Sequence, residues 1–178
     1  MKGIHFESNI SQGAEGSCYG YQYCCGGGGQ GGALFLSTPV IMDACSFRYN
    51  VVDSGPYGHD GCLPSNGGGL YFNTTSEMTM TNCFFGPQSG EQIYRVSSNN
   101  RLSMMNCTFL YSENETFSIV PGSNTWLVNS IVWGCDLSGN EGFVARYSDI
   151  MGGWDGEGNF DLDPLFIAPD DPHLSLGS

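Results

Sequence analysis

The chain has 178 residues, a length typical of one domain, with 40% hydrophobic and only 13% charged residues. This composition supplies enough apolar material for a core and too little charge for a disordered chain. Its net charge of −13 predicts repulsion from nucleic acids, anionic membranes and polyanionic polysaccharides, and leaves room for a cationic partner or a divalent metal. No apolar run approaches the roughly 18 residues of a membrane-spanning helix.

A short segment recurs along the chain, and such self-similarity is typical of repeat architectures. Its full copies are 40–47, 78–85, 102–109 and 125–132, with degenerate copies near both ends. The copies align on one position, occupied by Ile4, Cys45, Cys83, Cys107, Ser130 and Ser148. Hydrophobic residues stand three positions before it (Met42, Met80, Met104, Leu127) and two after it (Phe47, Phe85, Phe109, Val132). We expect these positions to face inward and to stack in columns.

Successive aligned positions lie 41, 38, 24, 23 and 18 residues apart. The three shorter intervals predict one coil of a parallel β-helix each, and the two longer ones predict a coil with an inserted loop. The fold class is therefore expected to be all-β: a right-handed parallel β-helix of about six coils in a single domain, 1–178. Loop insertions are predicted at 10–30 and 50–66, and a C-terminal closing segment at 151–178. A second strand of each coil is expected at 33–36, 69–72, 92–96, 117–120 and 142–145.

Two polar columns accompany the hydrophobic ones. The residue before the aligned position is Asn82, Asn106 or Asn129 in three copies, which predicts an asparagine ladder at a turn. The aligned cysteines Cys45, Cys83 and Cys107 are expected to be buried and free, because an unpaired cysteine packs as a small hydrophobic residue. A Cys83–Cys107 disulfide is the less favoured alternative.

Several of these motifs resemble the repeats of the chlamydial polymorphic outer-membrane proteins. Those repeats carry a Gly-Gly-Ala-Ile-like motif, which Gly31-Gly32-Ala33-Leu34 resembles. They also carry a Phe-x-x-Asn motif, which Phe6-Glu7-Ser8-Asn9 and Phe47-Arg48-Tyr49-Asn50 match. The copies at Phe85 and Phe109 lack the asparagine. The run 152–166 looks like the segment that closes many bacterial secreted right-handed β-helix proteins. The resemblance implies a secreted or cell-surface fragment of a longer chain, and it leaves the activity open because this architecture hosts adhesins, lyases and hydrolases.

The eight cysteines favour an oxidising compartment, so an extracellular or cell-surface location is expected, although the first residues lack the apolar region of a signal peptide. The first disulfide prediction joins Cys62 to one of Cys18, Cys24 or Cys25, because insertions from adjacent coils lie side by side. Candidate glycosylation sites begin at Asn9, Asn73, Asn106 and Asn114.

The sequence requires no cofactor, but two groups of residues are candidate metal sites. The acidic run Asp155, Glu157, Asp161 and Asp163 could bind Ca²⁺, which takes carboxylate and carbonyl oxygens. A turn followed by an edge strand is the alternative that needs no metal. His5 and His59 with nearby cysteines could bind Zn²⁺, but their spacing matches no strong zinc template.

The sequence favours a structural or adhesin-like surface module that contacts other copies, or the rest of a longer chain, through its end coils. The alternative is a carbohydrate-binding or polysaccharide-cleaving β-helix enzyme with glycans as partners, and a third option is a small metal-dependent hydrolase. The chain has no nucleophile elbow, phosphate loop or His-Glu-x-x-His motif, which argues against the enzyme classes that use them.

Overall fold

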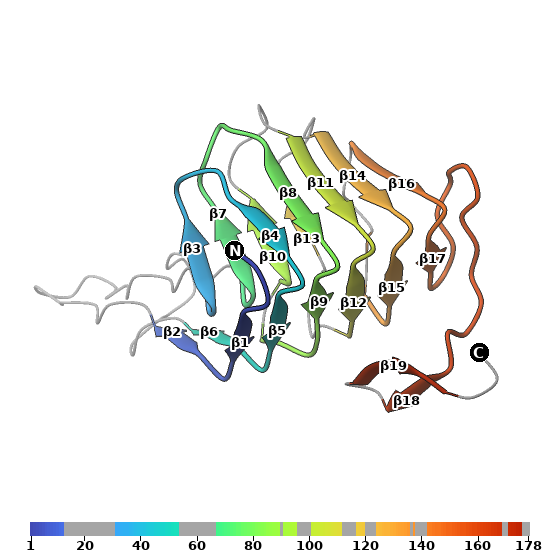
Figure 1. Ribbon diagram of the computed structural model, residues 1–178, viewed down its shortest axis with the longest axis horizontal. Helices are drawn as coiled ribbons and strands as arrows, with labels where there is room; N and C mark the ends of the chain where they lie inside the picture. Colours follow the sequence, from blue (N-terminus) through green and yellow to red (C-terminus); the bar gives the residue numbers. More distant parts are fainter. Residues whose placement is uncertain are drawn as a thin grey trace, which may run out of the picture.

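A computed structural model describes residues 1–12, 31–53, 67–89, 91–95, 101–111, 117–119, 124–135, 137, 142–168 and 171–175 (Figure 1). All regular secondary structure in these ranges is β. The described segments contain no helix that could cross a membrane.

Three parallel sheets carry most of the strands. The six-stranded sheet has the order β1 (His5–Glu7), β5 (Ser46–Arg48), β9 (Phe84–Phe85), β12 (Thr108–Leu110), β15 (Ile131–Trp133), β17 (Asp149–Ile150). The five-stranded sheet has the order β4 (Ile41–Asp43), β8 (Met78–Thr81), β11 (Arg101–Met105), β14 (Asn124–Val128), β16 (Phe143–Arg146). The four-stranded sheet has the order β3 (Leu34–Leu36), β7 (Leu70–Phe72), β10 (Ile93–Arg95), β13 (Phe117–Ile119).

The chain visits the four-, five- and six-stranded sheets in the same order four times, from β3 to β15. Each strand pairs in parallel with its counterpart from the next pass. A further parallel pair joins β2 (Ile10–Gln12) to β6 (Val51–Asp53). The all-β class and the parallel pairing are therefore confirmed.

The recurring segment is two strands rather than one. A residue in the left-handed region, with φ between +48° and +54°, separates them at Ala44, Asn82, Asn106, Asn129 and Tyr147. This bend sends the chain from the five-stranded sheet to the six-stranded one, so the Met and Phe columns lie on different sheets. The inward residues on its two sides, such as Met80 and Cys83, are three positions apart, an odd interval that breaks strict alternation and is the sequence signal of the bend.

The prediction that 142–145 forms a second strand of its coil is wrong. β16 instead extends the five-stranded sheet, where Ala145 pairs with Leu127. The spacing agrees with this place in the five-stranded sheet, because Ala145 lies three residues before Ser148, just as Met42 lies three residues before Cys45.

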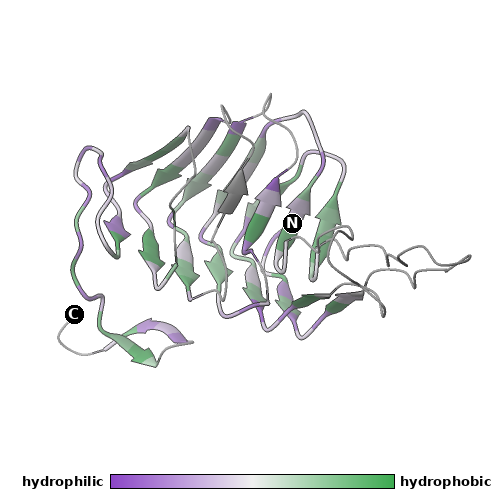
Figure 2. Ribbon diagram, turned by 180° about the vertical axis from the view of Figure 1, so that it is seen from behind, coloured by the Kyte–Doolittle hydropathy of each residue, from purple (hydrophilic) through white to green (hydrophobic). Residues whose placement is uncertain are grey.

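The predicted columns form a large part of the core, which also contains Leu70, Phe72 and Ile93 of the four-stranded sheet. The inward side chains of the columns are at most 1% exposed; these are Met42, Met80, Met104, Leu127, Ala145, Phe47, Phe85, Phe109, Val132 and Ile150. The rings of Phe6, Phe47, Phe85 and Phe109 stack with centroids 4.7 to 4.8 Å apart. This spacing is that of neighbouring strands, so parallel pairing in register places equivalent rings face to face. Figure 2 shows hydrophobic residues on strands of all three sheets and hydrophilic residues at many of the turns.

Residues 151–160 cover the last strands. Phe160 forms a parallel bridge with Asp149, and the Tyr147 amide donates to the Glu157 carbonyl at 2.8 Å. The Asn159 side chain accepts a hydrogen bond from the Ser148 amide at 3.1 Å and donates to the Ala145 carbonyl at 3.0 Å. Beyond this cover, β18 (Phe166–Ala168) and β19 (Asp171–Leu174) form an antiparallel hairpin (Figure 1).

Candidate functional site

An amide ladder, here called the buried amide ladder, runs beside the phenylalanine stack; it begins at the exposed Asn9 and is buried from Asn50 onward. Asn9 donates from Nδ2 to Oδ1 of Asn50 at 2.8 Å, Asn50 donates to Oε1 of Gln88 at 3.0 Å, and Gln88 donates to Gln92. Asn50 and Gln92 are 0% exposed. Asn9, Asn50 and Gln88 each lie three residues after a stacked phenylalanine. The shared offset is the sequence signal for Gln88, which replaces asparagine in the third copy of the motif.

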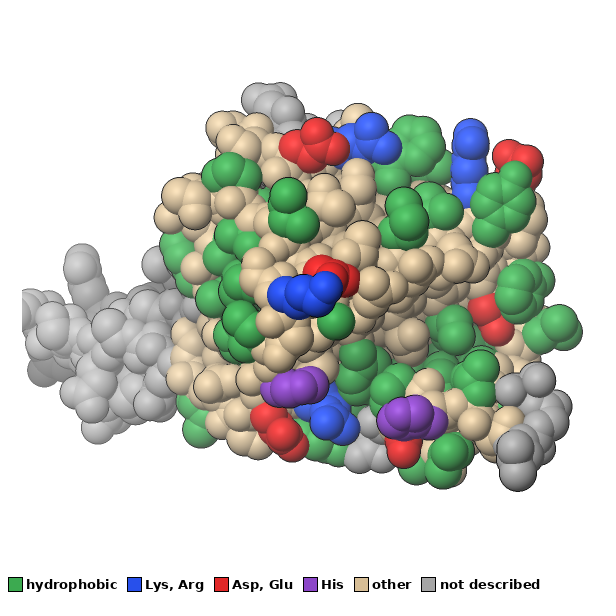
Figure 3. All heavy atoms as spheres, in the orientation of Figure 1, with side chains coloured by type: hydrophobic (Ala, Val, Ile, Leu, Met, Phe, Trp, Pro, Cys, Tyr) green, Lys and Arg blue, Asp and Glu red, His purple; other side chains and the backbone are tan. Residues whose placement is uncertain are grey.

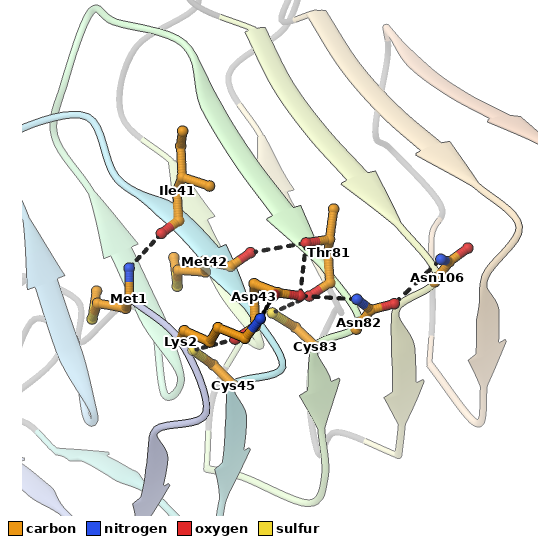
Figure 4. Close-up of polar contacts among 10 residues, drawn as sticks. All are labelled: Met1, Lys2, Ile41, Met42, Asp43, Cys45, Thr81, Asn82, Cys83 and Asn106. Carbon is orange, nitrogen blue, oxygen red and sulfur yellow. Dashed lines mark hydrogen bonds and ion pairs between the residues drawn. The ribbon is translucent and has the colours of Figure 1, made fainter.

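A second ladder follows the left-handed turns on the surface (Figure 4). Asn129 donates to Asn106 at 2.8 Å, Asn106 donates to Asn82 at 3.2 Å, and Asn82 donates to the Asp43 carboxylate at 2.9 Å. Lys2 contributes an ion pair to Asp43 at 3.1 Å. The hydrogen bond from Asn82, followed by that from Lys2, lowers the pKa of the Asp43 carboxyl. The structure thus brings the three asparagines together and ends their ladder on a carboxylate.

The aligned thiols lie directly after these turns. Cys45, Cys83 and Cys107 are 1 to 2% exposed, and Cys83 and Cys107 donate to the carbonyl two residues earlier at 3.2 and 3.4 Å. Ser130 makes the same contact at 2.8 Å, so this position selects a small side chain with a donor. The hydrogen bond with Cys83, together with burial, raises the pKa of the Cys107 thiol. These three cysteines and Cys135 form no disulfide within the described part of the chain, whereas the disulfide candidates Cys18, Cys24, Cys25 and Cys62 lie outside it.

An arginine lies inside the core, at a position where no sequence pattern predicts a charged residue. Arg95 is 2% exposed, pairs in register with Phe72, and donates from Nη1 to Oγ1 of the buried Thr125 at 2.9 Å. Burial lowers the pKa of Arg95 to about 10. Ile93 and Arg95 therefore face inward, which settles the orientation of this strand.

The outer face of the five-stranded sheet carries a Trp126 flanked by two arginines. The guanidinium carbons of Arg101 on β11 and Arg146 on β16 lie 5.1 and 5.7 Å from its ring centroid. Glu77 and Glu157 each lie 3.9 Å from one of these arginines. In Figure 3 the cationic groups on this side of the molecule stand beside acidic ones. Arginines from both neighbouring strands thus lie over the Trp126 ring, where a sugar would have to stack.

Two cavities lie between the six-stranded sheet and the C-terminal segment. The first, of about 430 Å³, is lined by residues that include Tyr111, Trp133, Asp163 and Phe166. The second, of about 460 Å³, is lined by Asn129, Ser130, Ile131, Tyr147, Asp149, Phe160, Leu162, Asp163, Pro164 and Leu174. Burial, reinforced by the charges of Asp161 and Asp163, raises the pKa of the Asp149 carboxyl. No sequence pattern singles out Asp149, because the residues that cover it, 160–164, lie outside the repeat.

The carboxylates proposed for Ca²⁺ mostly serve local contacts. Glu157 accepts from the Tyr147 hydroxyl, Asp161 from the Gly152 amide at 3.2 Å, and Asp163 from the Leu165 amide at 2.9 Å, while Asp155 is exposed. His5 contacts the Ser46 hydroxyl at 2.5 Å, and His59 lies outside the described residues. Within the described ranges, no three histidine, cysteine or acidic side chains are placed to hold a metal ion.

Three of the glycosylation candidates are described, and all three residues are exposed. The amides of Asn9 and Asn106 already donate within the two ladders, and Asn73 follows β7. Asn114 lies outside the described residues.

No protein-family model, curated protein or solved structure matches this chain. Its function is therefore argued from its own residues.

Proposed function

We propose that this chain is a right-handed parallel β-helix that serves as a structural, adhesin-like module outside the cell or at its surface. The parallel sheets, visited in a constant order, support the architecture. The resemblance of its motifs to those of the chlamydial polymorphic outer-membrane proteins supports the location.

The observation that carries this proposal is the continuity of the side-chain columns. The phenylalanine stack and the buried amide ladder each pass through successive layers, and the turn ladder does so at the surface. Repeat proteins gain stability from contacts between neighbouring layers, so such columns suit a rigid spacer or display shaft. The buried amides hold neighbouring layers together.

Contact with another copy, or with the rest of a longer chain, is proposed to use the end of the fold formed by β1, β3 and residues 1–3, which pair with β4. Large apolar side chains are exposed on or beside this end: Met1, Ile4, Ile10, Phe35 and Ile41. Open edges of this kind invite further strand pairing. The opposite end is covered by 151–160, so assembly through both ends is not favoured.

The location is tested by treating intact cells of the source organism with a membrane-impermeant biotin reagent. The proposal expects labelled chain from intact cells, and recovery of label only after lysis would contradict it. Adhesion is tested by counting host-cell or matrix attachment of beads that carry the folded chain, with beads that carry denatured chain as the control.

A second function, carbohydrate binding, is favoured by the cavity that Tyr111 and Trp133 line with Asp163. Aromatic rings with one carboxylate are a common arrangement for holding a small polar ligand. A glycan array and a reducing-end assay, with and without Ca²⁺, test binding and cleavage separately. Tyr111→Ala should abolish any binding that uses this cavity.

A further inference from the structure

The cavity of about 460 Å³ between the six-stranded sheet and the C-terminal segment has the size of a small-molecule site; such sites span about 300–1,000 Å³. Its floor is the outer face of β15 and β17, and its other walls include residues 160–164 and Leu174. Most of its lining is apolar, including Ile131, Phe160 and Leu162.

Asp149 brings an incompletely satisfied carboxylate to this cavity. Its side chain is largely buried, with the residue 5% exposed, and Oδ1 accepts a hydrogen bond from the Leu162 amide at 3.1 Å. Oδ2 accepts no hydrogen bond within the described part of the chain. A buried carboxylate oxygen without a donor costs free energy, so a ligand that donates to it would be stabilised.

The charges around Asp149 select a cation. Asp163 lines the same cavity, the charge of Asp161 also acts on Asp149, and none of the described residues that line it is a lysine, arginine or histidine. The chain as a whole carries a net charge of −13. An anion would be repelled here, whereas a cation would relieve the repulsion between the carboxylates.

An organic cation suits the cavity better than a metal ion. Ca²⁺ requires about six to eight oxygen ligands, whereas an ammonium group needs about three acceptors. We propose that this cavity binds a primary alkylammonium ion, whose ammonium group donates to Asp149 and Asp163 and whose alkyl chain lies against Ile131, Phe160 and Leu174. This binding site is independent of the proposed structural role.

The test is a methyl NMR titration of the whole chain with n-pentylammonium chloride. The site predicts saturable binding with one equivalent and shifts at the methyl groups of Ile131 and Leu174. n-Pentanol and n-pentanoate should bind at least about tenfold more weakly, since each lacks the charged donor. Absence of saturable binding, or equal binding of n-pentanol, would overturn the proposal, as would displacement of the amine by an equal concentration of Ca²⁺.

Substitutions assign the binding to this cavity. Asp149→Asn keeps the acceptor for the Leu162 amide and removes the charge, and Asp163→Asn removes the second charge; each should weaken binding about tenfold. Asp155→Asn is the matched control, because Asp155 is exposed on the same segment and does not line this cavity. Equal weakening by Asp155→Asn would overturn the assignment. Asp163 is itself exposed, so Asp163→Asn tests the charge requirement without changing a buried side chain.

Discussion

Asn50 donates from Nδ2 to Oε1 of Gln88 at 3.0 Å, and the two residues are 0% and 5% exposed. Asn50 also donates to the Phe6 carbonyl at 3.0 Å and accepts from the Asn9 amide and side chain. One side chain thus joins three successive layers of the fold. A substitution of Asn50 therefore breaks hydrogen bonds in all three layers at once.

Asn50→Leu should lower the free energy of unfolding by about 2–4 kcal/mol, because several buried partners lose their hydrogen bonds at once. Urea denaturation followed by circular dichroism measures the change. Asn73→Leu is the control, since Asn73 is exposed, and it should change stability by no more than about 0.5 kcal/mol. Equal effects of the two substitutions would show that the ladder adds nothing to stability.

The phenylalanine stack provides a second comparison between adjacent residues. Phe85 is 0% exposed and stacks on Phe47 and Phe109, whereas Phe84 faces outward near Arg48. Phe85→Ala should cost about 3–5 kcal/mol, since it opens a cavity in a column that cannot collapse. Phe84→Ala should cost about 1 kcal/mol or less. Chemical denaturation of both variants measures the two losses of unfolding free energy. Equal losses, or a larger loss for Phe84→Ala, would contradict the assignment of Phe85 to the core.

The left-handed turns predict a stabilising substitution. Ala44 has φ of +52° at the position where other copies carry asparagine. A residue with a Cβ is strained by about 1–2 kcal/mol in this region, and glycine avoids that strain. Glycine also loses more chain entropy on folding, which offsets about 0.5–1 kcal/mol of the gain. Ala44→Gly should therefore raise the free energy of unfolding by about 0.5–1 kcal/mol, and Ala44→Val should lower it. A lower melting temperature for Ala44→Gly than for the parent chain would contradict this account.

Residues that recur at a constant offset were predictable, and residues outside the repeat were not. Met80, Cys83 and Phe85 keep their spacing in neighbouring copies, so their columns follow from stacking alone. The bend at Asn82 could have been predicted, because the inward Met80 and Cys83 are three residues apart and one continuous strand would place them on opposite faces. Arg95 occupies a column that is apolar in the neighbouring strand, and no local pattern marks a core arginine. Asp149 is buried by residues 160–162, a contact that depends on how the C-terminal segment folds back.

Thiol reactivity should follow burial. Cys107 is 1% exposed and its pKa is raised by the hydrogen bond with Cys83 and by burial, so little thiolate is available. Cys135 is only partly buried. Iodoacetamide labelling with peptide mass mapping should show Cys107 reacting at least about tenfold more slowly than Cys135 in the native chain, and equally after unfolding. Rapid native labelling of Cys107 would contradict the buried column.

Asp149 should make stability depend on pH. Its pKa is raised by burial first and then by Asp161 and Asp163, so the folded chain holds this proton more strongly than the unfolded chain does. The resulting stabilisation is complete below the unfolded carboxyl pKa of about 3.9 and is lost as pH rises through the raised pKa. Asp149→Asn cannot ionise and keeps the acceptor for Leu162. Its melting temperature should therefore exceed that of the parent chain at pH 7, and this advantage should shrink towards pH 3. Asp155→Asn, which removes the same charge from an exposed site, controls for net charge; an equal gain there would assign the effect to net charge rather than to the burial of Asp149.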